Sequence, residues 1–200
     1  VRYGIDSRRV YIAGLSAGGA MATIVADSYP EIFAAVGVHS GLPRGAASSM
    51  MEAVAVMRAG RATPAAINRQ TRLVPTIVFH GDQDRTVHPR NGEQVMSAVL
   101  SRMNGSSAVE ITHGGRRNIE QGIASGGRRY TRSTFRNDSG GIVAEHWLVH
   151  GAGHAWSGGQ AGGTCTDTAG PDATRAMVRF FLAQRNGVAN AATNDADFAN

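Results

Sequence analysis

Short apolar runs recur along the chain, and a segment with apolar residues at helical spacing follows each of them. The runs at residues 9–15, 34–39 and 76–79 have the apolar character and length of buried strands. Strands that alternate with helices in this way are typical of an α/β fold with a mostly parallel sheet flanked by helices. We therefore expect that architecture.

Four segments carry the apolar spacing of helices. They span residues 17–29, 46–59, 91–103 and 171–182, the third capped by Asn91 and the last opened by Pro171. In the first helix the spacing selects Met21, Ile24, Val25 and Ser28. In the other three the expected inward residues are Met50, Ala53, Val54 and Met57; Val95, Met96, Val99 and Leu100; and Met177, Phe180, Phe181 and Leu182.

The C-terminal part of the sequence predicts a hairpin. Residues 128–136 and 142–149 are rich in β-branched and aromatic residues, and they flank the turn sequence Asn137-Asp-Ser-Gly-Gly. We expect the second of these strands to join the main sheet. Residues 187–200 are dominated by alanine, asparagine and aspartate, which predicts a flexible C-terminal tail.

The composition narrows the class of protein. Hydrophobic residues make up 42% of the 200 residues and charged residues 18%, which indicates a globular chain. No apolar run approaches the roughly 20 residues of a membrane-spanning helix. Cys165 is the only cysteine, so no disulfide can form within the chain. There is no signal-like segment at Val1.

The positive charge raises the alternative of a nucleic-acid-binding protein. The net charge is +5, all 20 basic residues are arginine, and six of them lie between Arg116 and Arg136. Such a cluster attracts polyanions without specificity. Only Tyr130 and Phe135 accompany it as aromatic residues, so we do not expect nucleic acid to be the partner.

The stretch GLSAGGAM, residues 14–21, follows the first strand and opens the first helix. A strand that enters a helix through Gly-x-Ser-x-Gly forms the sharp, strained turn of a nucleophile elbow. Gly14 and Gly18 would let strand and helix approach closely, and Ser16 would lie at the helix N-terminus. The backbone N–H of Ala17 is then a candidate oxyanion donor. The alternative is a glycine-rich turn with an incidental serine.

A serine nucleophile needs a base to take its proton and a carboxylate to orient that base. In this fold the chain order is serine, acid, histidine. The acid is expected in VFHGDQDRTVHP, residues 78–89, where Asp82 and Asp84 are both available. Spacing favours Asp84 only slightly. A metal site made of His80, Asp82, Asp84 and His88 is a weaker alternative, because loop residues of this kind seldom close a site without further ligands.

The base is expected near the last strand, in LVHGAGHAWSGG, residues 148–159. Of the seven histidines, only His146, His150 and His154 come late enough in the chain. His146 and His150 lie in the expected strand, where a structural role is more typical. His154 follows Gly-Ala-Gly in a loop at the strand's carboxyl end, so we expect it to be the base.

Five motifs follow one another along the chain: GLSAGGAM, VHSGLPRGAA, FHGDQDRTVHP, EHWLVHGAGHAWSGG and GPDATRAMVRFFL. Together, from about residue 10 to residue 182, they resemble the polyhydroxybutyrate (PHB) depolymerase-type esterase family, which includes feruloyl and acetyl-xylan esterases. The resemblance implies an α/β-hydrolase fold and a serine carboxylic-ester hydrolase. It assigns Ser16 as nucleophile, Asp84 as acid and His154 as base. Trp156 then either lines the substrate cleft or packs under the loop.

The resemblance also bears on partners. It implies a polymeric or small ester substrate, either a polyhydroxyalkanoate or related short-chain ester, or alternatively a feruloyl or acetyl-xylan ester. It implies no metal ion or organic cofactor, no obligate protein partner, and an extracellular location. A non-catalytic binding module with a hydrolase fold is the alternative from another class.

The sequence departs from the family at its start. Only 15 residues precede Ser16, whereas family members have a longer N-terminal half. We therefore expect residues 1–186 to form a partial catalytic domain that lacks the first strands of the sheet and the second oxyanion donor. Arg44 stands where an aromatic residue is more usual in the family, which bears on substrate preference.

Overall fold

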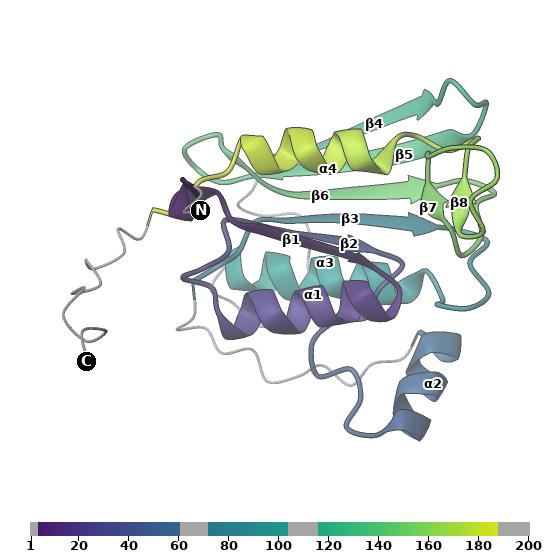
Figure 1. Ribbon diagram of the computed structural model, residues 1–200, viewed down its shortest axis with the longest axis horizontal. Coiled ribbons are helices and arrows are strands. Elements are labelled where there is room, and N and C mark those ends of the chain that lie inside the picture. Colours follow the sequence, from purple (N-terminus) through teal and green to yellow (C-terminus); the bar gives the residue numbers. More distant parts are fainter. Residues whose placement is uncertain (1–3, 61–71, 104–115, 188–200) are drawn as a thin grey trace.

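A six-stranded mixed sheet forms the central layer of the computed structural model, which describes residues 4–60, 72–103 and 116–187 (Figure 1). The elements are η1 (Ser7–Arg9), β1 (Tyr11–Leu15), α1 (Ala17–Ser28), β2 (Ala35–His39), α2 (Met50–Ala59), β3 (Thr76–Gly81), α3 (Arg90–Met103), β4 (Arg116–Ile123), β5 (Arg129–Arg136), β6 (Ile142–Val149), β7 (Trp156–Ser157), β8 (Thr166–Asp167) and α4 (Ala173–Leu182). Apart from its first residue, the predicted tail lies outside the described residues.

The strand order in the main sheet is β1-β2-β3-β6-β5-β4. β1, β2, β3 and β6 pair in parallel, while β5 and β4 are antiparallel to their neighbours. The predicted hairpin is confirmed as β5 and β6, and β6 joins the main sheet beside β3. β4 is an additional strand that the sequence pattern did not predict, because its sequence RRNIEQGI is mostly polar.

The parallel strands end together. Leu15 of β1 pairs with His39 of β2, His39 pairs with Phe79 of β3, and Phe79 pairs with Trp147 of β6. The residues that follow this row therefore lie along one edge of the sheet. In open α/β sheets this carboxyl edge is where ligands bind.

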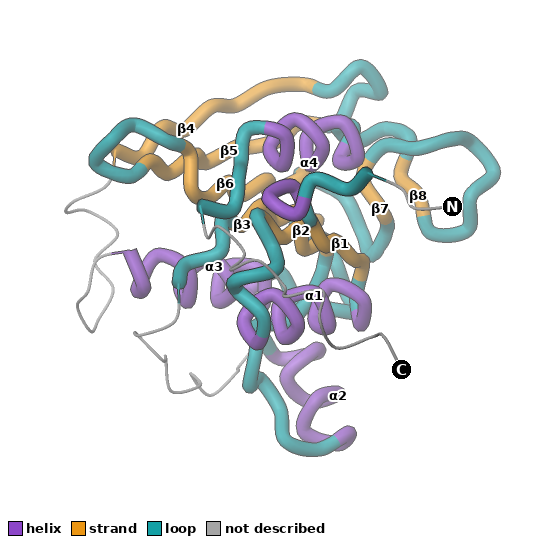
Figure 2. The backbone as a smooth tube through the Cα atoms, turned by 60° about the vertical axis from the view of Figure 1, so that its left-hand side comes forward, coloured by secondary structure: helices purple, strands orange, loops and turns teal. Residues whose placement is uncertain are grey.

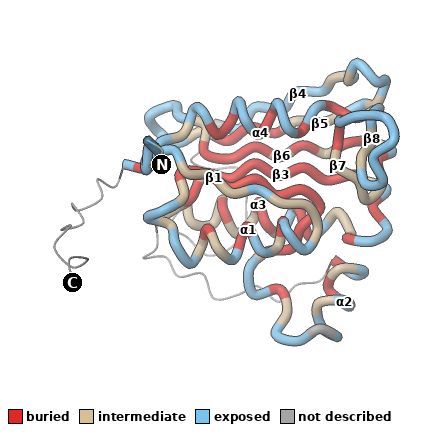
Figure 3. Tube along the Cα trace, in the orientation of Figure 1, coloured by how far each residue is buried: buried red, intermediate tan, exposed pale blue. Residues whose placement is uncertain are grey.

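Helices cover both faces of the sheet (Figure 2), and the buried residues concentrate in its central strands (Figure 3). The core on the α1 and α3 side includes Ala22, Ala26, Val36, Val38, Val78, Val95, Met96 and Val99. The core on the α4 side includes Ala35, Ile77, Phe79, Trp147, Met177, Phe180 and Phe181. In the part of the chain that the structure describes, none of the helices has the length and apolar character needed to cross a membrane.

The buried face of α1 differs from the prediction. Met21 is 56% exposed and Ile24 is 41% exposed, whereas the buried residues are Gly19, Ala22, Thr23 and Ala26. Small residues face inward because α1 lies very close to the end of β2. A Cβ atom on Gly19 would lie only 3.2 Å from the carbonyl oxygen of His39. The apolar spacing predicted that the larger side chains of Met21 and Ile24 face inward. The close approach of α1 to β2 leaves no room for side chains of that size on the inward face.

The inward faces predicted for α3 and α4 are largely confirmed. The buried residues include Val95, Met96, Val99, Met177, Phe180 and Phe181. Leu182 is an exception, since it is the last residue of α4 and its side chain is exposed. The face predicted for α2 differs: Val54 is exposed, Ala53 and Met57 are only partly buried, and Val56 is buried instead. The side chain of Met50 lies outside the described residues.

The start of two helices also differs from the prediction. α2 begins at Met50, not residue 46, and Ser49 caps it by accepting a hydrogen bond from the Glu52 N–H. α3 begins at Arg90, so Asn91 lies inside it and does not cap it. The buried Asn91 side chain instead donates to the carbonyl oxygens of Val56 and Met57, at 3.2 and 3.3 Å, and so joins α3 to α2.

Glu145 of β6 is fully buried and ties three elements together. Its carboxylate accepts hydrogen bonds from Arg132 of β5 at 2.8 Å, from Arg179 of α4 at 2.6 Å and from the Trp147 indole at 3.1 Å. Burial alone would raise the pKa of this carboxyl, but the hydrogen bonds from the two arginines outweigh burial and lower the pKa. In the folded protein Glu145 is therefore a charged carboxylate that pairs with the guanidinium groups of Arg132 and Arg179.

We predict that Glu145→Gln lowers the free energy of unfolding by about 3 kcal/mol, because both arginines lose their buried carboxylate. Glu120→Gln is the matched control: its side chain is 49% exposed and lies 3.4 Å from the same Arg132. We expect that control to change stability by less than about 0.5 kcal/mol. Urea denaturation of both variants measures the difference, and equal losses would contradict the assignment.

Candidate active site

Ser16 forms the sharp turn between β1 and α1, and the predicted strand–turn–helix geometry is confirmed. Its φ of 57° and ψ of −120° lie in a region that residues other than glycine rarely occupy. Its N–H donates to the carbonyl oxygen of His39 at 2.9 Å. The Ser16 hydroxyl makes no capping hydrogen bond to α1, so it is not used in helix capping.

The two glycines of the turn differ in importance. A Cβ atom on Gly14 would lie 2.2 Å from the backbone carbonyl carbon of Gly18, so no side chain fits there. A Cβ atom on Gly18 would meet nothing within 4 Å, and Gly18 is exposed. The close approach of strand and helix thus depends on Gly14, and the prediction that Gly18 is also needed for it was wrong.

Ala17 is the first residue of α1. The N–H groups of the first helical turn have no acceptor within the helix. They also lie at the positive end of the helix dipole. The Ala17 N–H is therefore a polar donor next to the Ser16 hydroxyl, where developing negative charge would be stabilised.

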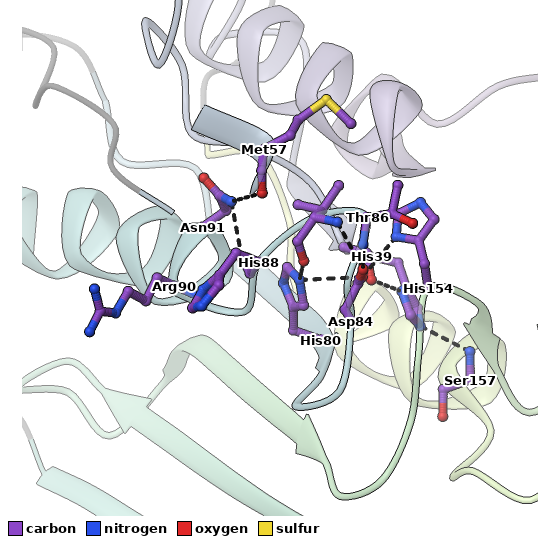
Figure 4. Close-up of polar contacts among 12 residues, drawn as sticks. His39, Met57, His80, Asp84, Thr86, His88, Arg90, Asn91, His154 and Ser157 are labelled. Carbon is purple, nitrogen blue, oxygen red and sulfur yellow. Dashed lines mark hydrogen bonds and ion pairs between the residues drawn. The ribbon is translucent and has the colours of Figure 1, made fainter. Parts of the chain in front are cut away.

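Asp84 and His154 come together at the carboxyl edge of the sheet (Figure 4). His154 Nδ1 lies 2.7 Å from Oδ2 of Asp84. The other carboxylate oxygen accepts the backbone N–H groups of Thr86 at 2.9 Å and Val87 at 2.8 Å. Asp84 is 4% exposed, so these bonds hold the carboxylate in one orientation. A proton on Nδ1 of His154 that points at this carboxylate leaves Nε2 as an acceptor.

His80 supports the loop that carries Asp84. Its Nε2 donates to the carbonyl oxygen of Val87 at 2.8 Å and lies 3.6 Å from the Asp84 carboxylate. The ring is fully buried, and burial lowers its pKa. A Cβ atom on Gly92 would lie 2.7 Å from Nδ1, so α3 packs directly against this ring.

Asp82 pairs with a different histidine. Its carboxylate lies 2.9 Å from Nδ1 of His150 and accepts the Gly151 N–H at 2.7 Å. Nε2 of His150 lies 2.9 Å from the Thr131 hydroxyl on β5. Both ring nitrogens of His150 are thus engaged within the fold, as expected for a structural histidine. His150 lies just beyond β6 and not within it, whereas His146 lies inside β6.

The segment that carries His154 crosses the end of β3. The Asp82 N–H donates to the carbonyl oxygen of Val149 at 3.1 Å, and the Gln83 N–H donates to that of Ala152 at 3.0 Å. A Cβ atom on Gly81 would lie 2.3 Å from the Ala152 carbonyl oxygen. Glycine at position 81 therefore lets the two loops approach until Asp84 and His154 are in contact.

His39, the last residue of β2, is a buried residue of the site that the sequence analysis did not identify. Its Nε2 accepts the Ser157 N–H at 2.9 Å. Its ring stacks on Phe79 and Trp156, with centroids 5.7 and 5.1 Å apart. Burial lowers the pKa of His39 to about 3. The available signal was a histidine that ends an apolar run and is followed by Ser-Gly.

Trp156 lies two residues after His154, in β7, which pairs with β8. It is partly buried, its ring stacks on His39, and its Nε1 donates to the Thr174 hydroxyl at 3.0 Å. The packing role considered for Trp156 is therefore present in the structure. A contact between Trp156 and the substrate stays a prediction.

The four side chains of the alternative metal site have their shortest polar contacts with other partners, although His80 also lies 3.6 Å from Asp84. Asp82 faces His150, Asp84 faces His154, His80 faces Val87, and His88 Nδ1 accepts the Arg90 N–H. Within residues 4–60, 72–103 and 116–187, no group of three or more histidine, cysteine, aspartate or glutamate side chains is arranged to hold a metal ion.

Several arginines of the predicted basic cluster are used within the fold. Arg132 pairs with Glu145, Arg128 forms an ion pair with Asp167, and Arg117 lies 5.7 Å from the centroid of the Phe135 ring. These contacts give the arginines a structural role on β4, β5 and the loop between them, which leaves the nucleic-acid alternative without added support.

Comparison with known proteins identifies related sequences. A family model described as "Esterase PHB depolymerase" matches residues 1–123. The chain is 30% identical over 164 residues to poly(3-hydroxyalkanoate) depolymerase C of Paucimonas lemoignei, covering 76% of this chain and 36% of that protein. It is 31% identical over 173 residues to poly(3-hydroxybutyrate) depolymerase of Ralstonia pickettii, covering 80% and 32%. The chain thus spans about a third of the length of these two relatives.

A solved structure supports the fold. The acetyl xylan esterase from Aspergillus awamori aligns with a TM-score of 0.57 at 20% sequence identity, over 90% of this chain and 62% of that one. At this identity the likeness concerns the fold alone. It agrees with the central sheet and its two helical layers, and the predicted α/β-hydrolase fold is confirmed.

We predict that Gly14→Ala lowers the free energy of unfolding by about 2–3 kcal/mol, because the added methyl group overlaps the Gly18 backbone. Gly18→Ala is the matched control, since its methyl group meets open space. We expect the control to stay within about 1 kcal/mol of the parent protein. Denaturation curves of the two variants test this, and a Gly18→Ala loss as large as that of Gly14→Ala would refute the distinction.

Proposed function

The chain belongs to the esterase PHB depolymerase family, and on that premise we propose that it carries the catalytic centre of a serine carboxylic-ester hydrolase. Ser16 is the nucleophile, His154 the general base and Asp84 the residue that orients it. The observation that carries the proposal is the 2.7 Å contact between His154 Nδ1 and the buried Asp84 carboxylate. It lies at the same sheet edge as the strained turn of Ser16.

The proposed reaction has two half-reactions. Ser16 Oγ attacks the acyl carbon while Nε2 of His154 takes its proton, and the resulting oxyanion collapses with cleavage of the ester C–O bond. His154 returns the proton to the departing alcohol, which leaves an acyl group on Ser16. A water molecule then loses a proton to Nε2 and attacks the acyl carbon. The acid leaves when His154 reprotonates Ser16 Oγ.

Asp84 has two tasks in this scheme. Its bond to Nδ1 keeps the proton of the neutral imidazole on that nitrogen, so that Nε2 faces the serine as a base. Its negative charge then stabilises the imidazolium that forms during attack. Because two backbone N–H groups and a buried environment already orient the carboxylate, little reorganisation is needed.

The Ala17 N–H is the oxyanion donor that we propose. It belongs to the first turn of α1, where the helix supplies no acceptor for it. Loss of one oxyanion donor typically costs about 10²–10³ in rate, so this group is a substantial part of the proposed site.

We propose a hydroxyalkanoate ester as the substrate, because two of the similar proteins carry poly(3-hydroxyalkanoate) or poly(3-hydroxybutyrate) depolymerase names. An acetyl-xylan or feruloyl ester is the alternative, supported by similarity to an acetylxylan esterase. We propose that Trp156 contacts the acyl group; its position two residues from His154 and its partial exposure support this. We propose an extracellular location, because a polymeric substrate supplied from outside a cell is too large to cross its membrane. Release of product from hydroxybutyrate oligomers and from methyl ferulate separates the two.

Labelling with a fluorophosphonate probe tests the proposed nucleophile and acid in the intact protein. We expect one adduct, on Ser16, and we expect Asp84→Asn to slow its formation by about 10³- to 10⁴-fold, because the imidazole then loses its carboxylate partner. Asp82→Asn is the matched control, two residues away in the same loop and bonded to His150. We expect it to slow labelling by less than about 10-fold.

Mass spectrometry locates the adduct, and circular dichroism confirms that each variant is folded. A folded parent protein that takes no label on Ser16 would overturn the proposed function and favour a non-catalytic binding module. Equal slowing by Asp82→Asn and Asp84→Asn would overturn the assignment of the acid alone.

A further inference from the structure

His39 is bonded to both the serine turn and the histidine loop. Its backbone carbonyl oxygen accepts the Ser16 N–H at 2.9 Å. Its side-chain Nε2 accepts the Ser157 N–H, also at 2.9 Å, three residues beyond His154. Figure 4 shows the contact between His39 and Ser157 beside the pair of Asp84 and His154. One buried residue therefore touches the two segments that a serine–histidine pair must bring together.

Such a link answers a geometric need of this sheet. Ser16 follows β1, whereas His154 follows β6, and β2 and β3 lie between those strands. Neighbouring strands are about 4.8 Å apart, so the loop after β6 must cross roughly 14 Å of sheet edge to approach β1. Contacts with Gly81 and Gln83 guide the loop over β3. The contact of Ser157 with His39 then fixes it on β2, next to the strand that carries Ser16.

The protonation state of His39 suits this task. Because a backbone N–H donates to Nε2, that nitrogen carries no proton, and the proton of the neutral ring lies on Nδ1. Nδ1 lies 3.2 Å from the hydroxyl of Ser40. The ring is 1% exposed, and burial keeps its pKa near 3, so the ring stays neutral and remains an acceptor.

The surrounding packing holds the ring in place. It is stacked against Phe79 on β3 and against Trp156, whose Nε1 is bonded to Thr174 of α4. Ser40, which follows His39, has a positive φ of 48°, and its N–H donates to the carbonyl oxygen of Phe79 at 2.9 Å. The backbone and the ring of His39 are thus both held in place. The ring binds the His154 loop through Ser157 and the backbone binds Ser16, so His39 holds the loop in position relative to Ser16.

We propose that His39 is a positioning residue that holds the His154 loop at the distance from Ser16 that proton transfer requires. This inference rests on the proposed function and adds a residue that acts through His154 without touching the substrate. The essential group is the acceptor at Nε2. A side chain of similar size without an acceptor would leave the Ser157 N–H unpaired and release the loop.

Two substitutions separate the acceptor from the bulk of the ring. The side-chain oxygen of His39→Gln reaches about as far as Nε2 and can accept the Ser157 N–H, whereas His39→Leu fills similar space without an acceptor. Both lose the aromatic stacking on Trp156, so that loss cancels in the comparison. We measure kcat and KM for 4-nitrophenyl butyrate and the rate of fluorophosphonate labelling of Ser16, at a temperature where both variants are folded.

We expect His39→Leu to lower kcat and the labelling rate by about 10²-fold, the usual effect of misplacing a catalytic group by about 1 Å. KM should change by less than about 3-fold, and His39→Gln should keep kcat within about 10-fold of the parent. A purely structural role predicts lower melting temperatures for both variants and equal kcat values in the folded state. That result would overturn the proposal.

A second pair guards against a failure of His39→Leu to fold. The amide of His39→Asn is polar but too short to reach the Ser157 N–H, so we expect it to lose kcat as His39→Leu does, while His39→Gln retains it. Equal activity of the Asn and Gln variants would overturn the role of the acceptor. If the parent protein takes no label on Ser16, the proposed function fails first. If the parent is labelled and the variants react equally fast, only the positioning role fails.

Discussion

The parallel pairing of β1, β2, β3 and β6 in one register is the constraint on which the rest of the site depends. The row from Leu15 through His39 and Phe79 to Trp147 aligns the strand ends. Each strand then delivers one component at the same edge: the Ser16 turn, the His39 acceptor, the Asp84 loop and the His154 loop. A shift of one residue in any pairing would turn the side chains of that strand to the other face of the sheet.

The constraint also explains where the chain tolerates no side chain. Gly14 allows α1 to turn directly over β1, and Gly81 allows the loop after β6 to pass over the end of β3. Both are close approaches of backbone to backbone, which a single added carbon prevents. Buried histidines also hold the loops of the site by hydrogen bonds. His39 accepts the Ser157 N–H in the loop after β6, and His80 donates to the Val87 carbonyl oxygen in the loop after β3. The loops of the site are thus hydrogen-bonded to residues of the sheet.

Local sequence was sufficient for the elements that depend on short-range pattern. The apolar runs predicted the parallel strands, the turn sequence before Ile142 predicted the hairpin, and the glycines around Ser16 predicted the sharp turn. Spacing alone left Asp82 and Asp84 open, and the reason is physical: each pairs with a histidine of the opposite loop, so both fit the pattern. Spacing favoured Asp84 only slightly, and the resemblance to a family then assigned it as the acid. The inward face of α1 and the role of His39 depend on how closely elements approach, which periodicity does not encode.

The most direct test of the central claim is a crystal structure of the intact protein after fluorophosphonate treatment. The account predicts a phosphonyl group on Ser16 Oγ, an oxygen of that group within hydrogen-bonding distance of the Ala17 N–H, and Nε2 of His154 within about 3.2 Å of Ser16 Oγ or a phosphonyl oxygen. The bonds from Asp84 to His154 and from Ser157 to His39 would be retained. A phosphonylated Ser16 whose nearest base is another residue, with His154 still bonded to Asp84 but out of reach, would contradict it.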